Sequence, residues 1–427
     1  MVLLRSAVVL LVALVLPRSQ SLGSPPPGEE PIVLEVGAGS WLRHETPIRW
    51  EIPSKLKMPE RLGPADFFLA EVPSGREVPA FQIDPGPPRA IVWILEADLP
   101  PGGKRRYRLT QRAATRDAGT PAVSAVRSSS EGPARIRVEA HGKPVFVYNV
   151  GEVPPPINVE PLYARSGYLH PVYTPAGRIL TNDSPPNHKH HHGIWMPWSQ
   201  TDFEGHPINF WEQNRLEGKV ECVGAEDVSG PVFGGVRAAH RFLDLKSAGG
   251  PKPVLDETWD VKVYAFAPQY FLVDFTSVQK CAGSSPLRFR QHRYGGFGFR
   301  GSADWEGPAG CEFITSEGKT RKDGHGTSAW WCEVFGKVGG EVAGISFLCH
   351  PSNFRAPQNM RIHEAEPFFN YTPCQEGDFE LAPGSSFVSR YRLVLHDGAL
   401  SVQELQRLWR DYAKPPSVAL VEGDGPQ

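Results

Sequence analysis

Trp259-Asp-Val-Lys-Val-Tyr264 and Phe271-Leu-Val-Asp-Phe275 are the stretches that decide the fold of this 427-residue chain. In the first, apolar and polar side chains largely alternate, and this period of two predicts a β-strand with a buried face; the second is a short, mostly apolar run, which also favours a strand. Similar short segments recur along the sequence, and turn-forming residues separate them. Glycine and proline number 43 each, which favours a turn-rich β-protein over a helical one. We therefore predict an all-β fold.

Working outward from these stretches, the strand signals fall into two groups. Residues 32–109 predict a small N-terminal β-sandwich, and residues 133–414 predict a large, mostly antiparallel β-sandwich. Residues 110–132 between them are polar or small, and are predicted to form a linker or a long loop. The larger unit should end in one helix over 401–414, because a capping box precedes an apolar stripe there.

The N-terminus predicts export. Arg5 precedes the ten-residue apolar run Ala7–Leu16, which is too short to cross a bilayer, so residues 1–24 read as a signal peptide. We expect cleavage between about Gln20 and Pro25, and a periplasmic or extracellular location. A net charge of -2 gives no reason to expect nucleic acid or a membrane as a partner. Six cysteines lie in the second half of the chain, and the sequence does not decide between disulfides and buried free thiols.

The run Asn187-His-Lys-His-His-His-Gly193 is the first candidate for chemistry. On a strand, His188, His190 and His192 would share one face, and three imidazoles on one face could bind a metal. Alternatively, His191 or His190 could act as a general acid or base without a metal. A solvated polar loop is the third interpretation. We expect no cofactor, with the metal as the open alternative.

Aromatic residues and a carboxylate follow the run. Trp195 and Trp211 could form flat platforms for sugar rings, although aromatic side chains also dominate protein cores. Glu212 lies beside Trp211, and a carboxyl among apolar rings tends to have a raised pKa and can act as an acid. We take Glu212 as the second catalytic candidate, with the histidine as its partner.

The remaining candidates are polar groups that could orient a substrate. Arg293 lies in a strand-like segment rich in polar groups, and His170, in Tyr168-Leu-His-Pro-Val-Tyr173, is a further candidate. His350, Asn353 and Arg355 follow an apolar strand, where sites are often built. For these two regions the competing interpretations are a solvated strand face and a structural turn.

These motifs together resemble a bacterial family labelled "methane oxygenase PmoA" over about residues 130–400. The resemblance implies an exported, carbohydrate-linked protein and an antiparallel fold similar to the galactose-mutarotase-like supersandwich. The family pattern has an arginine where this chain has His192, so a permanent charge at that position is not implied. The segments that carry the resemblance are Tyr168–Gly177, Pro186–Gly193, Asn209–Glu212, Tyr294–Arg300 and His350–Pro357.

The leading hypothesis is an exported carbohydrate-active enzyme that uses acid/base chemistry on a poly- or oligosaccharide, as a hydrolase, lyase or epimerase. A non-catalytic carbohydrate-binding protein and a histidine-ligated metal-dependent enzyme are the alternatives. If the motifs form one site, His191, Glu212, Arg293 and His350 should face a common cavity, because groups that are costly to bury unpaired would otherwise scatter over the surface.

Overall fold

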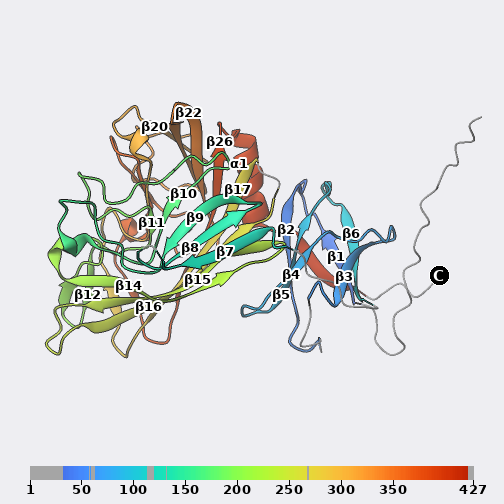
Figure 1. Cartoon of the computed structure of the whole chain (residues 1–427), viewed down its shortest axis with the longest axis horizontal. Helices are drawn as coiled ribbons and strands as arrows, with labels where there is room; N and C mark the ends of the chain where they lie inside the picture. The colour runs from blue at the N-terminus through green and yellow to red at the C-terminus, as the bar shows by residue number, and fades with distance from the viewer. Residues whose placement is uncertain are drawn as a thin grey trace, which may run out of the picture.

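The computed structural model describes residues 32–421 except 57, 59–62, 113–119, 131 and 267–268, so the predicted signal peptide lies outside the described residues. Strands dominate this part of the chain, which contains a single α-helix, and the all-β prediction is confirmed. Figure 1 shows a large unit and a smaller one side by side. No helix in the described part is long and apolar enough to span a bilayer.

The small unit is formed by two sheets packed around Trp93 and its apolar neighbours. Strand β2 illustrates the cause, since Ile48 and Trp50 are buried and the alternate Arg49 and Glu51 are exposed. One sheet has the order β27-β1-β6-β3 and the other β2-β5-β4. The bounds are β1 (Ile32–Gly37), β2 (Thr46–Glu51), β3 (Phe67–Val72), β4 (Phe81–Asp84), β5 (Ala90–Leu95), β6 (Lys104–Gln111) and β27 (Ser417–Val421).

The large unit is built on two eight-stranded antiparallel sheets whose facing side chains form the main core. The first sheet contains β23 (Met360–Ile362), β24 (Phe368–Tyr371), β19 (Phe297–Arg300), β11 (Ile194–Trp195), β10 (Tyr168–Val172), β9 (Lys143–Asn149), β8 (Arg135–Ala140) and β7 (Val123–Ser128). The second contains β14 (Gly218–Val228), β15 (Phe233–Asp244), β16 (Lys252–Tyr264), β17 (Tyr270–Cys281), β26 (Phe387–Asp397), β22 (Glu341–Cys349), β21 (Trp331–Val338) and β20 (Cys311–Thr315). Trp259–Tyr264 and Phe271–Phe275 lie in β16 and β17, which pair near the middle of the second sheet.

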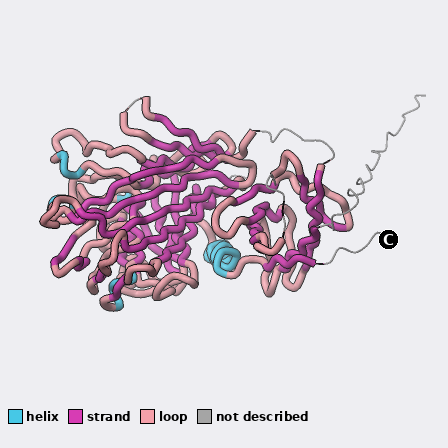
Figure 2. Tube along the Cα trace, turned by 90° about the horizontal axis from the view of Figure 1, so that it is seen from below, coloured by secondary structure: helices cyan, strands magenta, loops and turns pink. Residues whose placement is uncertain are grey.

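Smaller elements complete the unit. A four-stranded sheet contains β13 (His206–Ile208), β12 (Thr201–Phe203), β18 (Leu287–Phe289) and β25 (Phe379–Leu381). The 3-10 helices are η1 (Pro161–Tyr163), η2 (Gln213–Arg215), η3 (Ala303–Trp305) and η4 (Pro373–Glu376). Helix α1 (Val402–Ala413) begins as predicted, with the Ser401 side chain accepting a hydrogen bond from the Glu404 N–H, and it buries Leu405 and Leu408. Figure 2 shows α1 beside the junction of the two units.

Two parts of the predicted domain division need correction. The stretch predicted as a linker or long loop, 110–132, contains strand β7, which pairs with β8 along its whole length. Its alternate residues Val123 and Ala125 are buried, so small side chains suffice for a strand there. Strand β27 follows the end of the predicted large unit at 414, but it pairs with β1 of the small unit.

A buried charge cluster joins the two units. Asp84 of β4 is buried and lies 2.8 Å from Arg237 and 2.9 Å from Lys262, both of which belong to the large unit. Arg49 of β2 completes the cluster at 2.5 Å. Burial alone would raise the pKa of Asp84, but Lys262 and Arg49 outweigh it and lower the pKa to about 2. Asp84 is therefore ionised at any ordinary pH and links the units.

All six cysteines are free thiols, four of them fully buried. Export would permit disulfides, but these side chains fill core positions instead. Cys311, Cys332 and Cys349, for example, belong to the main core.

The strand register of the first large sheet assigns side chains to its two faces. Leu169, Ile194 and Phe299 lie opposite one another and point into the core. In the neighbouring row, Trp195, Gly298, Asn370 and Arg361 lie opposite one another and point the other way. We call this second side of the sheet, which also carries Tyr168 and Phe368, the outer face.

Candidate functional site

The histidine run is a turn that leads into β11. The His188 N–H donates to the Pro185 carbonyl at 3.0 Å, and the His191 N–H donates to the His188 carbonyl at 2.9 Å. The predicted strand alternation is therefore wrong before residue 192. Gly193 ends the turn at a φ of 45°, and a Cβ there would lie 2.1 Å from the Leu169 carbonyl oxygen. The turn folds the imidazoles back onto the outer face.

His191 lies inside a stack of rings. Its imidazole is parallel to that of His188 at 4.6 Å between centroids and to the Phe368 ring at 4.8 Å. Trp195 lies 5.3 Å away. The side chain is buried, and this burial, together with the charge of neighbouring His190, holds its pKa well below the usual range. His191 is therefore neutral, and its Nδ1 has no hydrogen-bond partner in the described part of the chain.

His190 is half-buried at the edge of this stack. Its ring lies 4.9 Å from that of His191 and 5.6 Å from that of His188, both edge to face. Burial and then the charges of His188, His192 and Arg300 lower its pKa to about 3. Within the described residues, neither of its ring nitrogens makes a hydrogen bond. It is thus a neutral imidazole with both nitrogens available to a ligand.

Glu366 supplies a carboxylate to the same cluster. Its Oε2 lies 3.0 Å from Nδ1 of His188, out of line for a hydrogen bond, and it accepts from Nη1 of Arg300 at 2.7 Å. Asn187 donates to Oε1 at 3.0 Å. Burial lowers the pKa of His188, although the charge of Glu366 opposes that change. The pair therefore joins a neutral imidazole to a carboxylate that Arg300 holds in place.

His363 adds a fourth imidazole, 6.3 Å from His188. Its Nδ1 accepts from the backbone N–H groups of Ala365 and Glu366 at 3.2 and 3.1 Å. The neutral ring therefore carries its proton on Nε2, where it can donate to a ligand. Burial lowers its pKa, so the neutral form is the relevant one.

His192 belongs to a different network. Its Nδ1 lies 2.7 Å from Asp183 and its Nε2 lies 3.3 Å from Oε1 of Gln213, while the Tyr168 hydroxyl also donates to Asp183. Burial would raise the pKa of Asp183, but the hydrogen bonds from His192 and Tyr168 and the charges of His192 and His170 together outweigh it and lower the pKa. His170 lies beside this network, with Nδ1 2.9 Å from the Thr181 hydroxyl and a pKa lowered by burial.

The proposed metal set of His188, His190 and His192 does not form. His192 is held by Asp183, away from the stack of the other two. Across the described residues, no group of three or more His, Cys, Asp or Glu side chains has an arrangement suited to a metal ion. The turn is the physical cause, because it replaces the strand alternation that would have aligned the three rings.

The tryptophans are not sugar platforms. Trp195 and Trp211 are 0 and 1% exposed and pack with Tyr168 and Phe368 in one apolar cluster. This corrects the sequence prediction, and the cause is ordinary aromatic packing. Half-buried Tyr294, 4.9 Å from Trp211, is the ring of this cluster nearest to solvent.

Glu212 differs from the prediction in its surroundings. It accepts hydrogen bonds from Nδ2 of Asn209 at 2.9 Å and from Nε of Arg215 at 2.6 Å, so it is a paired carboxylate and not one isolated among apolar rings. It does lie near the site, because its charge helps to raise the pKa of Tyr294, after the larger effect of burial. Arg293 lies over the same Tyr294 ring at 5.6 Å. His191, Glu212 and Arg293 are thus joined through Trp211 and Tyr294.

His350 does not join them. Its ring packs on Tyr412 of helix α1 at 5.0 Å, and its charged neighbours are Arg390, Asp274 and Arg392 of the second sheet. Helix α1 covers the side of the second sheet that faces away from the core, so His350 lies on a different side of the unit from the outer face. The prediction of a common cavity for all four residues is therefore wrong.

Asn353 and Arg355 have structural roles. The Asn353 amide donates to the backbone carbonyl of Arg390 and accepts from its N–H, both at 2.8 Å. Arg355 donates to the carbonyls of Pro373 and Gly377 at 2.7 and 2.8 Å. Both side chains satisfy backbone groups, which corrects their assignment to substrate binding.

A family model identifies relatives of the chain. The model of a family described as "Family of unknown function (DUF6807)" matches residues 135–410. The chain belongs to this family. The match includes the histidine run, His363 and Glu366. The resemblance to the PmoA-labelled family remains a prediction.

No curated protein matches the chain. Among solved structures, a galactose mutarotase related enzyme from Lactobacillus acidophilus is similar, with 9% sequence identity and a TM-score of 0.27. The similarity covers 64% of this chain and 100% of that one. The β-sandwich assignment for this DUF6807 member rests on its own strands and their register.

Sequence reasoning missed Glu366, His363, Asp183 and Arg361. A signal for the first two exists, since His363-Glu-Ala-Glu366 places a histidine and two carboxylates within four residues. Nothing in the sequence shows that this segment meets the histidine run, because the contact depends on the pairing of β11, β19 and β24.

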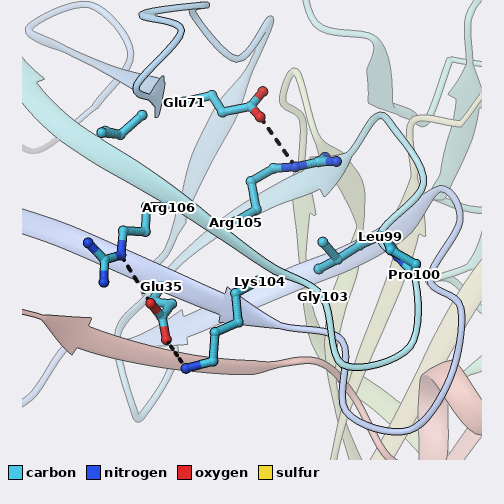
Figure 3. A pocket seen from close by; sticks show the side chains of 9 residues that line it. Glu35, Glu71, Leu99, Pro100, Gly103, Lys104, Arg105 and Arg106 are labelled. Atoms are coloured by element: carbon cyan, nitrogen blue, oxygen red, sulfur yellow. Dashed lines mark hydrogen bonds and ion pairs between the residues drawn. The ribbon is translucent and has the colours of Figure 1, made fainter.

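A separate pocket of about 570 Å³ lies on the small unit, lined by charged residues of β1, β3 and β6 (Figure 3). Lys104 and Arg106 pair with Glu35 at 2.6 and 3.0 Å, and Arg105 pairs with Glu71 at 3.4 Å. Its charges are satisfied among themselves, so the outer face of the large unit is the better candidate for chemistry.

Proposed function

We propose that the outer face is the active site of an exported carbohydrate-active enzyme that transfers protons without a metal. The observation that carries the proposal is the convergence of three neutral imidazoles with unpartnered nitrogens, those of His188, His190 and His191, beside the carboxylate of Glu366. Perturbed titratable groups gathered in one place are typical of active sites.

His190 is the proposed acid/base group. Both of its nitrogens are free, and its neutral form can accept a proton from a substrate hydroxyl or ring carbon. Because burial and then the surrounding charges disfavour its imidazolium form, His190 is a weak base before substrate binds, and a proton taken up there is readily returned to a leaving group or to the substrate. His188, with Glu366 beside it, belongs to the stack of rings against whose edge His190 packs.

Hydrolysis, elimination and epimerisation of a sugar all need such a group, and their products tell them apart. The purified mature chain is incubated with a panel of oligosaccharides, with and without a chelator. Addition of water, formation of an unsaturated sugar, or an isomer of unchanged mass identifies the reaction by mass spectrometry and NMR. The proposal expects one of these products, at the same rate in the presence of the chelator.

The variant His190→Gln tests the assignment, because it keeps a polar group of similar size but cannot transfer a proton at neutral pH. We expect kcat to fall by roughly 10²–10⁴-fold with unchanged folding. His350→Gln is the matched control, a histidine of the same unit on another side of it, and should retain activity. Full activity in His190→Gln would overturn the assignment. Sugar binding without any product would favour the non-catalytic binding protein, and activity lost with the chelator would favour the metal enzyme.

Export is the second part of the proposal, and residues 1–24 support it. N-terminal sequencing of secreted protein should find a start between about Gln20 and Pro25. Mature material that begins at Met1 would contradict export while leaving the proposed chemistry untouched.

A further inference from the structure

Two guanidinium groups of the outer-face region lack full partners. Arg361 of β23 is 7% exposed, and its Nη1 donates to the Ile362 carbonyl at 2.9 Å. Both Nη1 and Nη2 donate long hydrogen bonds of 3.4 Å to Glu364, whose side chain is 76% exposed and therefore well screened by water. One buried cation is thus weakly compensated.

Arg293 is the second cation, and it is exposed. Within the described part of the chain its guanidinium makes no hydrogen bond or ion pair, and its contact is with the Tyr294 ring at 5.6 Å. Next to it, Nε2 of His292 is buried without a hydrogen-bond partner. The Arg293 guanidinium and Nε2 of His292, both beside the Tyr294 ring, are therefore without partners among the described residues.

Both cations act on the same neighbouring histidine. After the larger effect of burial, the charges of Arg361 and Arg293 lower the pKa of His325, whereas the charge of Glu364 opposes them. Burial and then Arg293 lower the pKa of His292 in the same way. The carboxylate that opposes this effect on His292, Glu212, is already paired with Arg215 at 2.6 Å. Apart from Glu364 beside Arg361, no carboxylate of the described residues lies within 4.0 Å of either guanidinium group.

We propose that the site takes an anionic saccharide, whose carboxylate or sulfate group is received by Arg293 and Arg361. A guanidinium presents a planar pair of donors that matches either group, and an uncompensated one gains most from a charged acceptor. Tyr294 and His292 then lie beside the sugar unit that carries the charge. The inference rests on the proposed function, since it names the class of sugar that the acid/base site acts on.

Calorimetric titration of the mature chain with three tetrasaccharides tests the inference. The probes are a galacturonate oligomer, a sulfated galactan oligomer and the neutral galactan oligomer, each at low and at moderate salt. We expect at least one acidic probe to bind 10-fold or more tightly than the neutral one, and this preference to shrink with added salt. The two acidic probes show whether carboxylate or sulfate is the natural group.

Arg293→Gln should reduce the acidic preference at least fivefold while changing the affinity for the neutral probe less than twofold. Arg293 is exposed, so this variant should fold normally. The matched control is Arg410→Gln, an exposed arginine of helix α1, which should keep the preference. Equal binding of all three probes, or an unchanged preference in Arg293→Gln, would overturn this inference and leave the proposed function standing. Failure of every probe to bind would overturn both.

Discussion

Replacing Glu366 by Gln removes a carboxylate that pairs with the buried Arg300 and also lies beside His188 of the site. Arg300 is fully buried, and it is held by Glu366 at 2.7 Å and by Glu306. Removing the partner of a buried ion typically costs about 3–5 kcal/mol. Because Glu306 remains and the amide oxygen of Gln can still accept from Arg300, we expect a loss of about 2 kcal/mol in the free energy of unfolding.

Glu306→Gln is the matched comparison, since it also takes one carboxylate from Arg300. The Glu306 side chain is 37% exposed, against 14% for Glu366, so water already screens its charge. We expect a loss below about 1 kcal/mol for this variant. Urea unfolding at pH 7, followed by tryptophan fluorescence, measures both losses.

A second measurement separates a purely structural role from a role in the site. The charge of Glu366 opposes the fall in the pKa of His188 more than any other neighbour does, and Glu306 opposes it less. The pKa of His188, followed by NMR, should therefore fall further in Glu366→Gln than in Glu306→Gln. Equal stability losses in the two variants, or an unchanged titration of His188, would refute the placement of Glu366 in the cluster.

Three further predictions concern the rest of the molecule. Asp84 has a pKa of about 2 against an ordinary 3.8, so its ionised form stabilises the fold by about 2 kcal/mol above pH 4, and this stabilisation is lost as the pH falls toward 2. Calorimetry of Asp84→Asn should show a lower unfolding temperature at pH 7 and a weaker dependence of that temperature on acid pH. His190 is neutral in the unliganded folded state, with a pKa of about 3, so the free energy of unfolding should fall as the pH drops below about 6.5. This fall should be smaller in His190→Gln. Gly193→Ala should lower stability by at least about 2 kcal/mol, because its Cβ would meet the Leu169 carbonyl at positive φ, whereas Gly249→Ala, which meets nothing within 4 Å, should not.

The fold could be predicted because the alternation in β16 and β17 is local and one face of each strand is buried. Helix α1 was equally accessible, since Ser401 and Glu404 lie within one turn of the chain. Strand β7 was missed because its small side chains lack the apolar signal, although burial of two of them suffices for pairing.

The site could be predicted only in part because it depends on pairing between distant strands. The register of β11, β19 and β24 brings the histidine run beside Phe368 and Glu366, and no local pattern reports that register. Polarity also misled at His350 and Asn353, where a turn uses polar side chains to satisfy backbone groups. A polar motif in a sequence therefore indicates either a functional site or side chains that satisfy backbone groups. The hydrogen-bond partners in the structure distinguish the two.

The partners of two buried histidines show how that decision is made here. His240 is buried in the core, and both of its nitrogens are satisfied, by the Tyr148 hydroxyl at 2.6 Å and by Glu257 at 3.0 Å. His191 is buried as well, but its Nδ1 has no partner among the described residues. Leaving a buried polar group unsatisfied costs roughly 1–3 kcal/mol, and such groups are rare in folded proteins. Other unsatisfied buried atoms lie elsewhere in the described residues, such as Nε2 of His396, but His188 and His292 add two such groups to that of His191 on this side of the sheet. A ligand that supplies hydrogen-bonding groups there, as a sugar does, would remove this cost, whereas the network around His240 leaves nothing for a ligand to satisfy.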